Sequence, residues 1–360
     1  MTAMLAPASP EDLVDAVRST PRLIATGSGT KPRLSATDAV RLSTARLRGI
    51  VEYEPSEFTF TARAGTPLRE IGAELAVRGQ YLPFDPVLVD AGATLGGTVA
   101  AGLNGPGRFR FGGVRDFILG VRVVDGDGRL LRLGGKVVKN AAGFDLPKFF
   151  VGSLGRFGVL AEVTLKVFPR PASRLTLRLE TASVGDAARL VADAARSRWD
   201  PEAIDYSPAA ARVYLRLSGP AASLPRLARD VLDRWPGEPM SPPDADAHWT
   251  DITEFRWAHA GGLLLKVPST PATMAAIRQT LETVGDARVH FSAGGHVAWV
   301  SIAAGTPAAD LDRTLGQSGL TALTLRGDGP LWWGPRSRPR ITAAVKAALD
   351  GPHRFPSLDD

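Results

Sequence analysis

Cysteine is absent from all 360 residues of the chain. This absence excludes disulfide bonds, thiolate zinc sites, iron–sulfur ligation and covalent thioether links to a cofactor within the chain. If the protein carries out redox chemistry, its electrons must pass to oxygen, to a quinone or to another subunit.

Long apolar runs are also missing. No segment approaches the roughly 18 consecutive apolar residues that a membrane-spanning helix needs. The opening sequence MTAMLAPASPEDLVDAV has neither the charged start nor the long apolar core of a signal peptide. We therefore expect a cytoplasmic protein that does not insert into a membrane itself and reaches one only through a partner.

The charge balance is moderately basic, with a formal net charge of +6. Arginines are scattered among acidic residues, a pattern more typical of a solvated surface than of a nucleic-acid footprint. We expect no nucleic-acid partner, and the positive excess is available to an anionic cofactor or an acidic substrate. The chain is long enough, at 44% hydrophobic content, for two globular domains.

Histidine is scarce, and all five histidines lie at or after position 248. His290 and His296 are six residues apart in HFSAGGH, on an expected hairpin with no asparagine and no acidic residue beside them in sequence. Two histidines in such a place are more typical of a surface pair than of a metal site. The sequence therefore predicts no metal.

Glycine is plentiful between residues 92 and 159, mostly where strands and helices are expected to end. Such glycines permit positive φ or a close approach of the backbone to a ligand. An earlier glycine loop, TGSGTK at residues 26–31, follows a short apolar run. Consecutive amides in such a turn can form an anion-binding nest with hydroxyls and a lysine, although an ordinary tight turn is the alternative.

Two common phosphate-binding motifs are excluded by the spacing of these loops. The chain has neither a G-x-x-x-x-G-K-[ST] sequence nor a G-x-G-x-x-G fingerprint after a strand. A nicotinamide-binding Rossmann domain is therefore disfavoured.

The two glycine loops, in this order, resemble the FAD-binding family of vanillyl-alcohol oxidase and p-cresol methylhydroxylase (PCMH) type. The resemblance continues through GGVRDFILGVRVVDGDG, KNAAGFD and VGSLGRFGVLAEVTLKVFP and covers residues 20–170. Within the family, ARAGTPLREIGAEL, GQYLPFDP and GATLGGTVAAGLNGP are most similar to the FAD-binding E-type subunits of glycolate oxidase. Non-covalent FAD is the implied cofactor, because the first loop has no histidine and the chain no cysteine.

The resemblance also implies which residues contact FAD. Those expected to bind the cofactor are Gly27, Ser28, Gly29, Thr30 and Lys31 of the first loop; Gly92, Thr94, Gly96, Gly97 and Thr98 of the second; Gly102, Asn104 and Gly112 near the flavin ring; and Gly152, Gly155, Gly158 and Val159 near the adenosine.

The chain departs from the pattern of active relatives in three places. Gly102 replaces an asparagine, Leu154 replaces a glutamate, and a C-terminal element is shortened to DGPHRFPS and lacks its asparagine. The metal-site pattern of related D-2-hydroxy-acid dehydrogenases is absent as well. These departures favour a subunit that relays electrons or supports a complex whose main substrate site lies elsewhere.

The predicted fold class is α+β. A PCMH-type FAD-binding domain made of two α/β subdomains is expected at 1–170, a ferredoxin-like cap at 171–335, and a C-terminal helix and tail at 336–360. Two prolines in Pro169-Arg170-Pro171 mark the first boundary because they interrupt helices and strand pairing. After it, strand and helix patterns recur in a ferredoxin-like order, with a proline-rich break at 236–243.

Local patterns predict three elements before the boundary. Alternation of Phe58, Phe60, Ala62 and Ala64 predicts a strand over 57–65. Thr66 as N-cap and Pro67 in the first turn predict a helix with an apolar stripe at Leu68, Ile71 and Leu75. Asp-Gly-Asp-Gly at 125–128 predicts a hairpin between the strands that flank it.

The implied function is flavin-mediated oxidation of a small 2-hydroxy acid, glycolate above all, in a heteromeric complex. The implied partners are a D-type flavoprotein subunit and an iron–sulfur subunit. The catalytic candidates are Arg256, as a clamp for the substrate carboxylate, and His259. The other candidate side chains are Arg110, Arg115, Lys136 and Lys139. A stand-alone FAD-dependent reductase and a non-catalytic assembly subunit remain alternatives.

Overall fold

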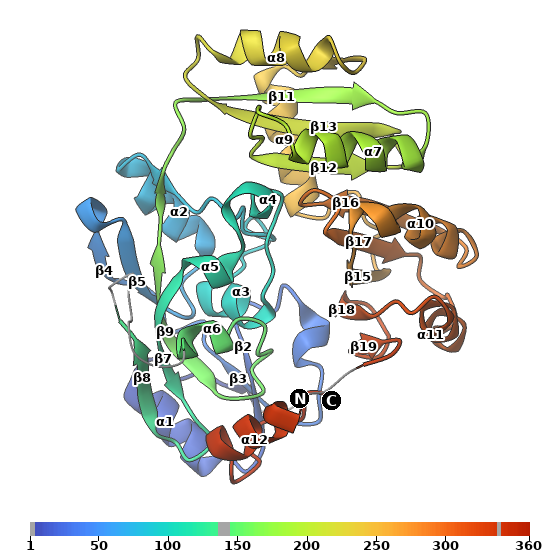
Figure 1. Ribbon diagram of the computed structural model, residues 1–360. Helices are drawn as coiled ribbons and strands as arrows, with labels where there is room; N and C mark the ends of the chain where they lie inside the picture. The colour runs from blue at the N-terminus through green and yellow to red at the C-terminus, as the bar shows by residue number, and fades with distance from the viewer. Residues whose placement is uncertain (1–3, 136–144, 337–339) are drawn as a thin grey trace. The chain divides into compact units, whose positions relative to one another are not determined.

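The structure is a computed structural model that describes residues 4–135, 145–336 and 340–360. Its described residues divide into two compact units (Figure 1). Unit 1 comprises 4–104, 112–135, 145–170 and 340–360. Unit 2 comprises 105–111 and 171–336. The chain therefore enters unit 2 briefly at 105–111 and returns to unit 1 for its last helix.

Unit 1 is built on a five-stranded antiparallel sheet of order β4-β5-β9-β7-β8. A parallel three-stranded sheet of order β1-β3-β2 and a two-stranded pair β6-β10 complete it. The strands are β1 (Met4–Leu5), β2 (Leu23–Thr26), β3 (Val40–Ser43), β4 (Ile50–Glu54), β5 (Thr59–Arg63), β6 (Gln80–Tyr81), β7 (Ile118–Val124), β8 (Leu130–Gly134), β9 (Val159–Lys166) and β10 (Phe168–Pro169).

The helices of unit 1 are mostly short and lie at the ends of these strands. They are α1 (Pro10–Ser19), η1 (Pro32–Ser35), η2 (Pro55–Glu57), α2 (Leu68–Val77), α3 (Leu95–Ala101), α5 (Val114–Phe117), α6 (Leu146–Phe149) and α12 (Arg340–Leu349). The expected hairpin of strands β7 and β8 around Asp-Gly-Asp-Gly is confirmed.

Two local expectations in unit 1 are wrong. Strand β5 begins at Thr59, because Phe58 adopts φ 54° and is 41% exposed. Helix α2 is preceded by Pro67 at its N-cap, because the Thr66 hydroxyl bonds instead to the main chain of Gly49 and Arg63. The predicted apolar stripe of α2, at Leu68, Ile71 and Leu75, is buried.

Unit 2 contains two consecutive strand-helix-strand-strand-helix-strand repeats, each with the ferredoxin-like order. The first runs β11-α7-β12-β13-α8-β14 and the second β15-α10-β16-β17-α11-β18. They join edge to edge in one nine-stranded sheet of order β14-β11-β13-β12-β16-β17-β15-β18-β19. The sequence predicted a ferredoxin-like sheet, and the structure shows that it is doubled.

The elements of unit 2 have the following bounds. They are α4 (Arg108–Phe111), β11 (Ser173–Glu180), α7 (Val184–Ala195), β12 (Ala203–Ser207), β13 (Arg212–Gly219), α8 (Leu224–Leu232), β14 (Gly237–Pro239), α9 (Pro242–Thr253), β15 (Leu263–Pro268), η3 (Pro271–Thr273), α10 (Met274–Glu282), β16 (Ala287–Ser292), β17 (Val297–Ile302), α11 (Ala308–Gln317), β18 (Ala322–Arg326) and β19 (Trp332–Trp333).

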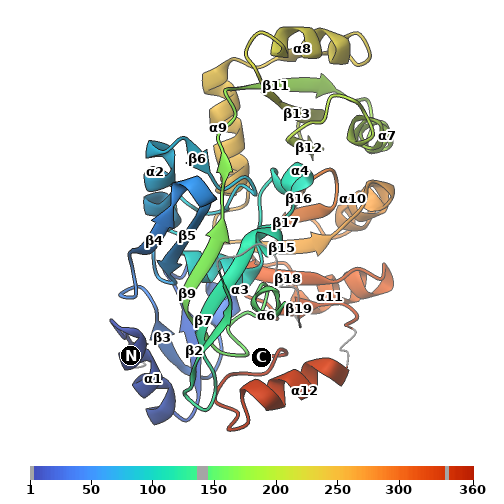
Figure 2. The same cartoon turned by 60° about the vertical axis from the view of Figure 1, so that its left-hand side comes forward.

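Four helices of unit 2, α7, α8, α10 and α11, pack on one face of the sheet around a single apolar core. Helix α9 lies on the other face, where Trp249 packs against Ala203 and Tyr214 (Figure 2). The sequence did not predict α9, because its first turn is the proline pair 242–243, which was interpreted as a break. Proline is well tolerated at the start of a helix, and Ser241 caps this one.

One buried carboxylate makes several polar contacts at the seam between the two repeats. Backbone pairing of β12 with β16 is confined to Tyr206 and Phe291. Beside it, the fully buried Asp205 accepts hydrogen bonds from Ser292 Oγ (3.0 Å) and the Ala293 amide (2.9 Å) and contacts His290 Nε2 at 2.9 Å. The side chain of Asp205 thus supplies polar contacts that the short strand pairing does not.

Candidate functional site

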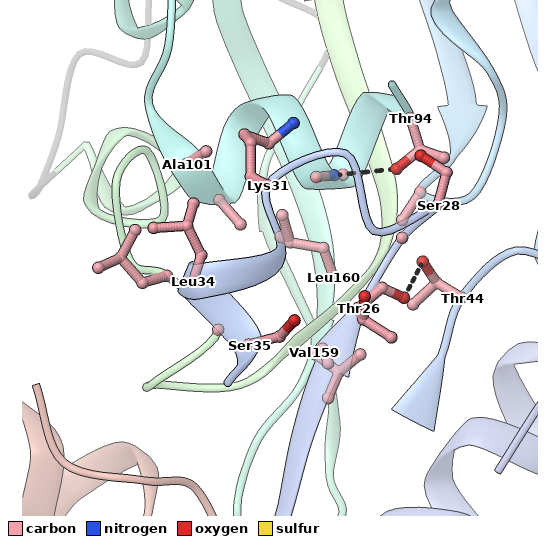
Figure 3. A pocket seen from close by; sticks show the side chains of 18 of the residues that line it. Thr26, Ser28, Lys31, Leu34, Ser35, Thr44, Thr94, Ala101, Val159 and Leu160 are labelled. Atoms are coloured by element: carbon pink, nitrogen blue, oxygen red, sulfur yellow. Dashed lines mark hydrogen bonds between the residues drawn. The ribbon is translucent and has the colours of Figure 1, made fainter. Parts of the chain in front are cut away.

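A pocket in unit 1 brings together three segments that are far apart in the sequence (Figure 3). The first is the loop after β2 with η1, the second is helix α3, and the third is the turn before β9 with the start of that strand. The space between their atoms, open mouth included, is about 690 Å³.

Eleven of the predicted cofactor-binding residues line this pocket. They are Gly27, Ser28, Gly29, Thr30, Lys31, Thr94, Gly96, Gly97, Gly155, Gly158 and Val159. The lining residues that were not predicted to contact the cofactor are Ala25, Thr26, Leu34, Ser35, Thr44, Ala64, Ala100, Ala101, Ser153, Leu154 and Leu160. Most of the latter are small or apolar residues beside the glycines, without a motif of their own.

The first loop presents a run of free backbone donors. Within the described part of the chain, the amides of Gly27, Ser28, Gly29 and Thr30 donate to no protein acceptor. Successive unpaired amides in a turn are the donor set that binds phosphate oxygens. This loop therefore has the chemistry of an anion site.

Lys31 adds a positive charge to this loop. Its side chain is buried, at 8% exposure, and its ammonium bonds to Thr30 Oγ1 at 2.9 Å. Burial lowers the pKa of Lys31 to about 8. Among the described residues no carboxylate forms an ion pair with it, and a buried cation without an anionic partner is costly. A bound anion would remove that cost.

The first loop and the start of helix α3 approach each other closely at Gly27. A Cβ atom on Gly27 would lie 2.2 Å from Thr94 Oγ1, which already accepts a hydrogen bond from the Gly97 amide at 3.3 Å. Only a residue without a side chain fits there.

The third segment is fixed to the C-terminal end of α3. The amides of Gly152 and Leu154 donate to the carbonyls of Val99 and Ala100 at 3.0 and 2.9 Å. Leu154 has a left-handed backbone with φ 53°, which is unusual for a bulky residue. The leucine that replaces the family's glutamate therefore lines the pocket in a strained turn.

Six predicted cofactor residues do not line the pocket: Gly92, Thr98, Gly102, Asn104, Gly112 and Gly152. Gly102 instead ends α3 with φ 62°, where a Cβ would lie 3.1 Å from the Gly152 backbone. Asn104 Oδ1 accepts a hydrogen bond from the Val114 amide at 2.6 Å. These local roles explain the residues at both positions without a ligand.

The candidate catalytic residues lie in unit 2, after helix α9. Arg256 is half-exposed and forms an ion pair with Asp251 at 3.1 Å. His259 is tied to Ser301 through its amide and Nδ1, and its Nε2 lies 3.0 Å from Asp286 Oδ2. That second contact has ion-pair distance without hydrogen-bond geometry. Arg110 pairs with Asp200 at 2.5 Å, and Arg115 is exposed. Lys136 and Lys139 lie outside the described residues.

The expectation of a surface histidine pair is wrong. His290 is 2% exposed and contacts the buried Asp205, whereas His296 is exposed. The acidic partner comes from β12, far away in sequence, and local sequence could not reveal it. Elsewhere on this sheet face, burial lowers the pKa of His248 to about 4. The described residues hold no group of three or more histidine, cysteine or acidic side chains arranged to bind a metal.

Part of the sequence matches a known class of domain. Residues 1–134 match the family described as FAD binding domain, and FAD is the cofactor of that family. The glycine segments of the pocket up to residue 101 fall inside the matched range. The turn that precedes β9 lies beyond it.

Individual relatives refine this assignment. The chain is 53% identical over 133 residues to glycolate oxidase subunit GlcE of Escherichia coli, covering 37% of this chain and 38% of that protein. It is 29% identical over 157 residues to glycolate oxidase subunit GlcD of Bacillus subtilis, covering 44% and 33%. The chain thus aligns with little more than a third of the length of these relatives.

The fold extends further than the sequence similarity. A solved structure of alkyldihydroxyacetonephosphate synthase matches 97% of this chain and 74% of its own chain, with a TM-score of 0.70 and 16% identity. At this identity the match shows a shared α+β fold alone, which confirms the predicted fold class. In the described part of the chain, no helix combines the length and apolar character required to span a bilayer.

Proposed function

We propose that this chain is the FAD-carrying subunit of a multi-subunit enzyme that oxidises small 2-hydroxy acids, with glycolate as the first substrate to test. The observation that carries the proposal is the donor set of the first loop: four unpaired amides and the buried Lys31 ammonium, which has no carboxylate partner among the described residues. The 53% identity to a glycolate oxidase subunit supports the choice of reaction.

The pocket residues fit FAD. The first loop and Lys31 would hold the pyrophosphate, because its negative charge matches their unpaired donors. Gly96 and Gly97 would let the α3 backbone approach the cofactor, and Gly155, Gly158 and Val159 would form the opposite wall. When bound, FAD supplies a hydride acceptor in its flavin ring.

Oxidation of a 2-hydroxy acid to the 2-oxo acid removes a hydride from the α-carbon and a proton from the hydroxyl group. Arg256 is our candidate for binding the substrate carboxylate through two parallel hydrogen bonds. To do so, its guanidinium would leave the exposed ion pair with Asp251. His259 is the candidate for accepting the hydroxyl proton. The remaining predicted contacts, Gly92, Thr98, Gly102, Asn104, Gly112 and Gly152, belong to the same proposal as groups near the bound cofactor.

This chain has no cysteine to ligate an iron–sulfur cluster, so electrons from its flavin pass to oxygen, to a quinone or to another subunit. We assign that step to an iron–sulfur partner and the main substrate site to a D-type flavoprotein partner. The name of the GlcD relative supports a multi-subunit arrangement.

The test begins with the visible absorption spectrum of the purified chain, alone and co-expressed with the two partner subunits. Each sample then receives glycolate, D-lactate or NADPH without oxygen. Bleaching of the flavin by glycolate in the complex is the expected result. Bleaching by NADPH would identify a stand-alone reductase, and a colourless chain that still assembles with the partners would identify an assembly subunit.

A further inference from the structure

Arg156 is a fully buried arginine of unit 1 whose guanidinium bonds to main-chain oxygens. Its Nη1 donates to the carbonyls of Leu34 and Leu154, both at 2.6 Å. Its Nη2 donates to the main-chain oxygen of Asp360 at 2.8 Å, and Nε to that of Ser357 at 3.4 Å. The charge of Asp360 also attracts the Arg156 guanidinium.

Two of these acceptor residues line the pocket. Leu34 belongs to η1 after the first glycine loop, and Leu154 is the strained residue before β9. One guanidinium therefore joins two pocket segments that are not connected by a sheet. Its planar fork fixes the distance between their carbonyls, which a flexible ammonium would not do.

The other two acceptors belong to residues 351–360, which follow helix α12. Lys346 of α12 strengthens this connection: its ammonium lies 2.5 Å from the Arg156 carbonyl, 2.9 Å from that of Phe355 and 2.6 Å from the buried Asp350 carboxylate. Residues 351–360 are thus bonded to the side chain of Arg156 directly and to its carbonyl group through Lys346.

We infer that Arg156 is a positioning residue for the cofactor, and that residues 346–360 act through it to hold the two leucine walls of the pocket at the spacing that FAD requires. This inference rests on the proposed function. Preorganising a site in its bound geometry raises affinity because less ordering remains to be done on binding. Loss of the clamp should therefore weaken FAD binding in a protein that is still folded.

Arg354 offers a matched control. It lies within residues 351–360 and, like Arg156, its guanidinium donates to main-chain oxygens. These are the carbonyls of Gly126 at 2.9 Å and Thr20 at 2.8 Å, and neither residue lines the pocket. The experiment compares Arg156→Met, Arg156→Lys, Arg354→Met and a deletion of residues 357–360. Each is titrated with FAD at a temperature where far-ultraviolet circular dichroism shows a native fold, and unfolding by urea is measured on the cofactor-free form.

We expect both methionine variants to lower the unfolding midpoint, but Arg156→Met alone to raise the Kd for FAD, by about tenfold or more. Arg156→Lys should recover part of the affinity and of the wild-type flavin spectrum, and the deletion should give an intermediate Kd. If Arg156→Met does not fold, the Kd of the deletion variant for FAD tests the inference instead. Arg22→Ala is then the control, because the deletion also removes the Arg22–Asp360 ion pair.

A Kd within about twofold of wild type in folded Arg156→Met or in the deletion would overturn the inference, as would equal losses in Arg156→Met and Arg354→Met. Those results leave the proposed function standing as long as wild type binds FAD. A wild-type chain that takes up no FAD would overturn the proposed function itself.

Discussion

Gly27 and Thr94 lie so close that a single added carbon on Gly27 would fall 2.2 Å from the threonine hydroxyl. The loop after β2 and the start of α3 are thus in contact at a point where no side chain fits between them. Affinity for a cofactor in this pocket depends on backbone geometry at such points, and glycine substitutions test it directly.

FAD should be released completely when the purified protein is precipitated with acid. The chain has no cysteine and its pocket is lined by no histidine, so the residues that commonly form covalent flavin links are missing. The measurement is the flavin absorbance of supernatant and pellet. Yellow colour that stays in the pellet would contradict the prediction.

Gly97→Trp should abolish flavin retention while the protein keeps its fold. The glycine lines the pocket on α3, and an indole there would occupy cofactor space. Gly72→Trp is the control, because that helical glycine of α2 has open space beside it. Flavin content is compared with far-ultraviolet circular dichroism. Full occupancy in folded Gly97→Trp would place the cofactor elsewhere.

FAD affinity should fall as the pH rises above about 8, the pKa of Lys31 in the cofactor-free protein. The protonated ammonium binds the diphosphate, and the diphosphate raises this pKa, so binding takes up a proton in that window. The Kd should rise by about tenfold per pH unit until the pKa of the complex is reached. Lys31→Met should show weak binding with no such dependence.

The cofactor-free protein should show the opposite trend. The unfolded chain keeps a lysine pKa near 10.5, so between pH 8 and 10.5 the unfolded state binds more protons than the folded state. The contribution of Lys31 to the free energy of unfolding therefore rises with pH across this window. If the free energy of unfolding of Lys31→Met rises with pH as much as that of the wild type, groups other than Lys31 cause the rise.

The isolated, flavin-loaded chain should oxidise glycolate slowly or not at all, and activity should appear with the partner subunits. Gly102 serves as a helix cap, Leu154 replaces an acid, and Arg256 is engaged with Asp251. A missing orienting group can cost on the order of a hundredfold in rate. Rapid bleaching of the isolated chain by stoichiometric glycolate would refute this, and Arg256→Lys would then be the first variant to assay.

Asp205→Ala should destabilise unit 2 strongly. It removes the acceptor of three buried contacts at the seam, including that to His290, and each buried donor left without a partner costs about 1–3 kcal/mol. Asp286→Ala, which breaks an exposed contact to His259, should cost about 1 kcal/mol or less. Urea denaturation compares the two. Equal costs would show that the seam does not depend on Asp205.

Much of unit 1 could be predicted because its signals are local. Apolar periodicity gave α2, Asp-Gly-Asp-Gly gave the β7–β8 hairpin, and two glycine loops pointed to the pocket. The local sequence does not predict that Leu154 bonds to α3 or that Arg156 joins Leu34 to Leu154. Both contacts are made to backbone carbonyl groups, which every residue has. Gly102 was misleading for a similar reason, since a helix cap and a cofactor contact both favour glycine.

In unit 2 the strand and helix order was readable, but the doubling into one sheet was not. A sheet seam of a single backbone pair leaves little trace in hydrophobic patterning. The partner of His290 was missed because Asp205 lies on another repeat. Sequence periodicity reports which face a residue takes, and it does not report which distant strand lies beside it.

Unit 1 takes residues from before and after unit 2, and its last helix is α12. During synthesis the glycine loops emerge early, whereas Lys346 and the oxygens that hold Arg156 emerge only after the whole of unit 2 has been made. Domains commonly fold in the order in which they leave the ribosome, at about 5–20 residues per second. In this protein the unit that starts first is completed last, because the contacts of Arg156 with residues 346–360 can form only after unit 2 has been made.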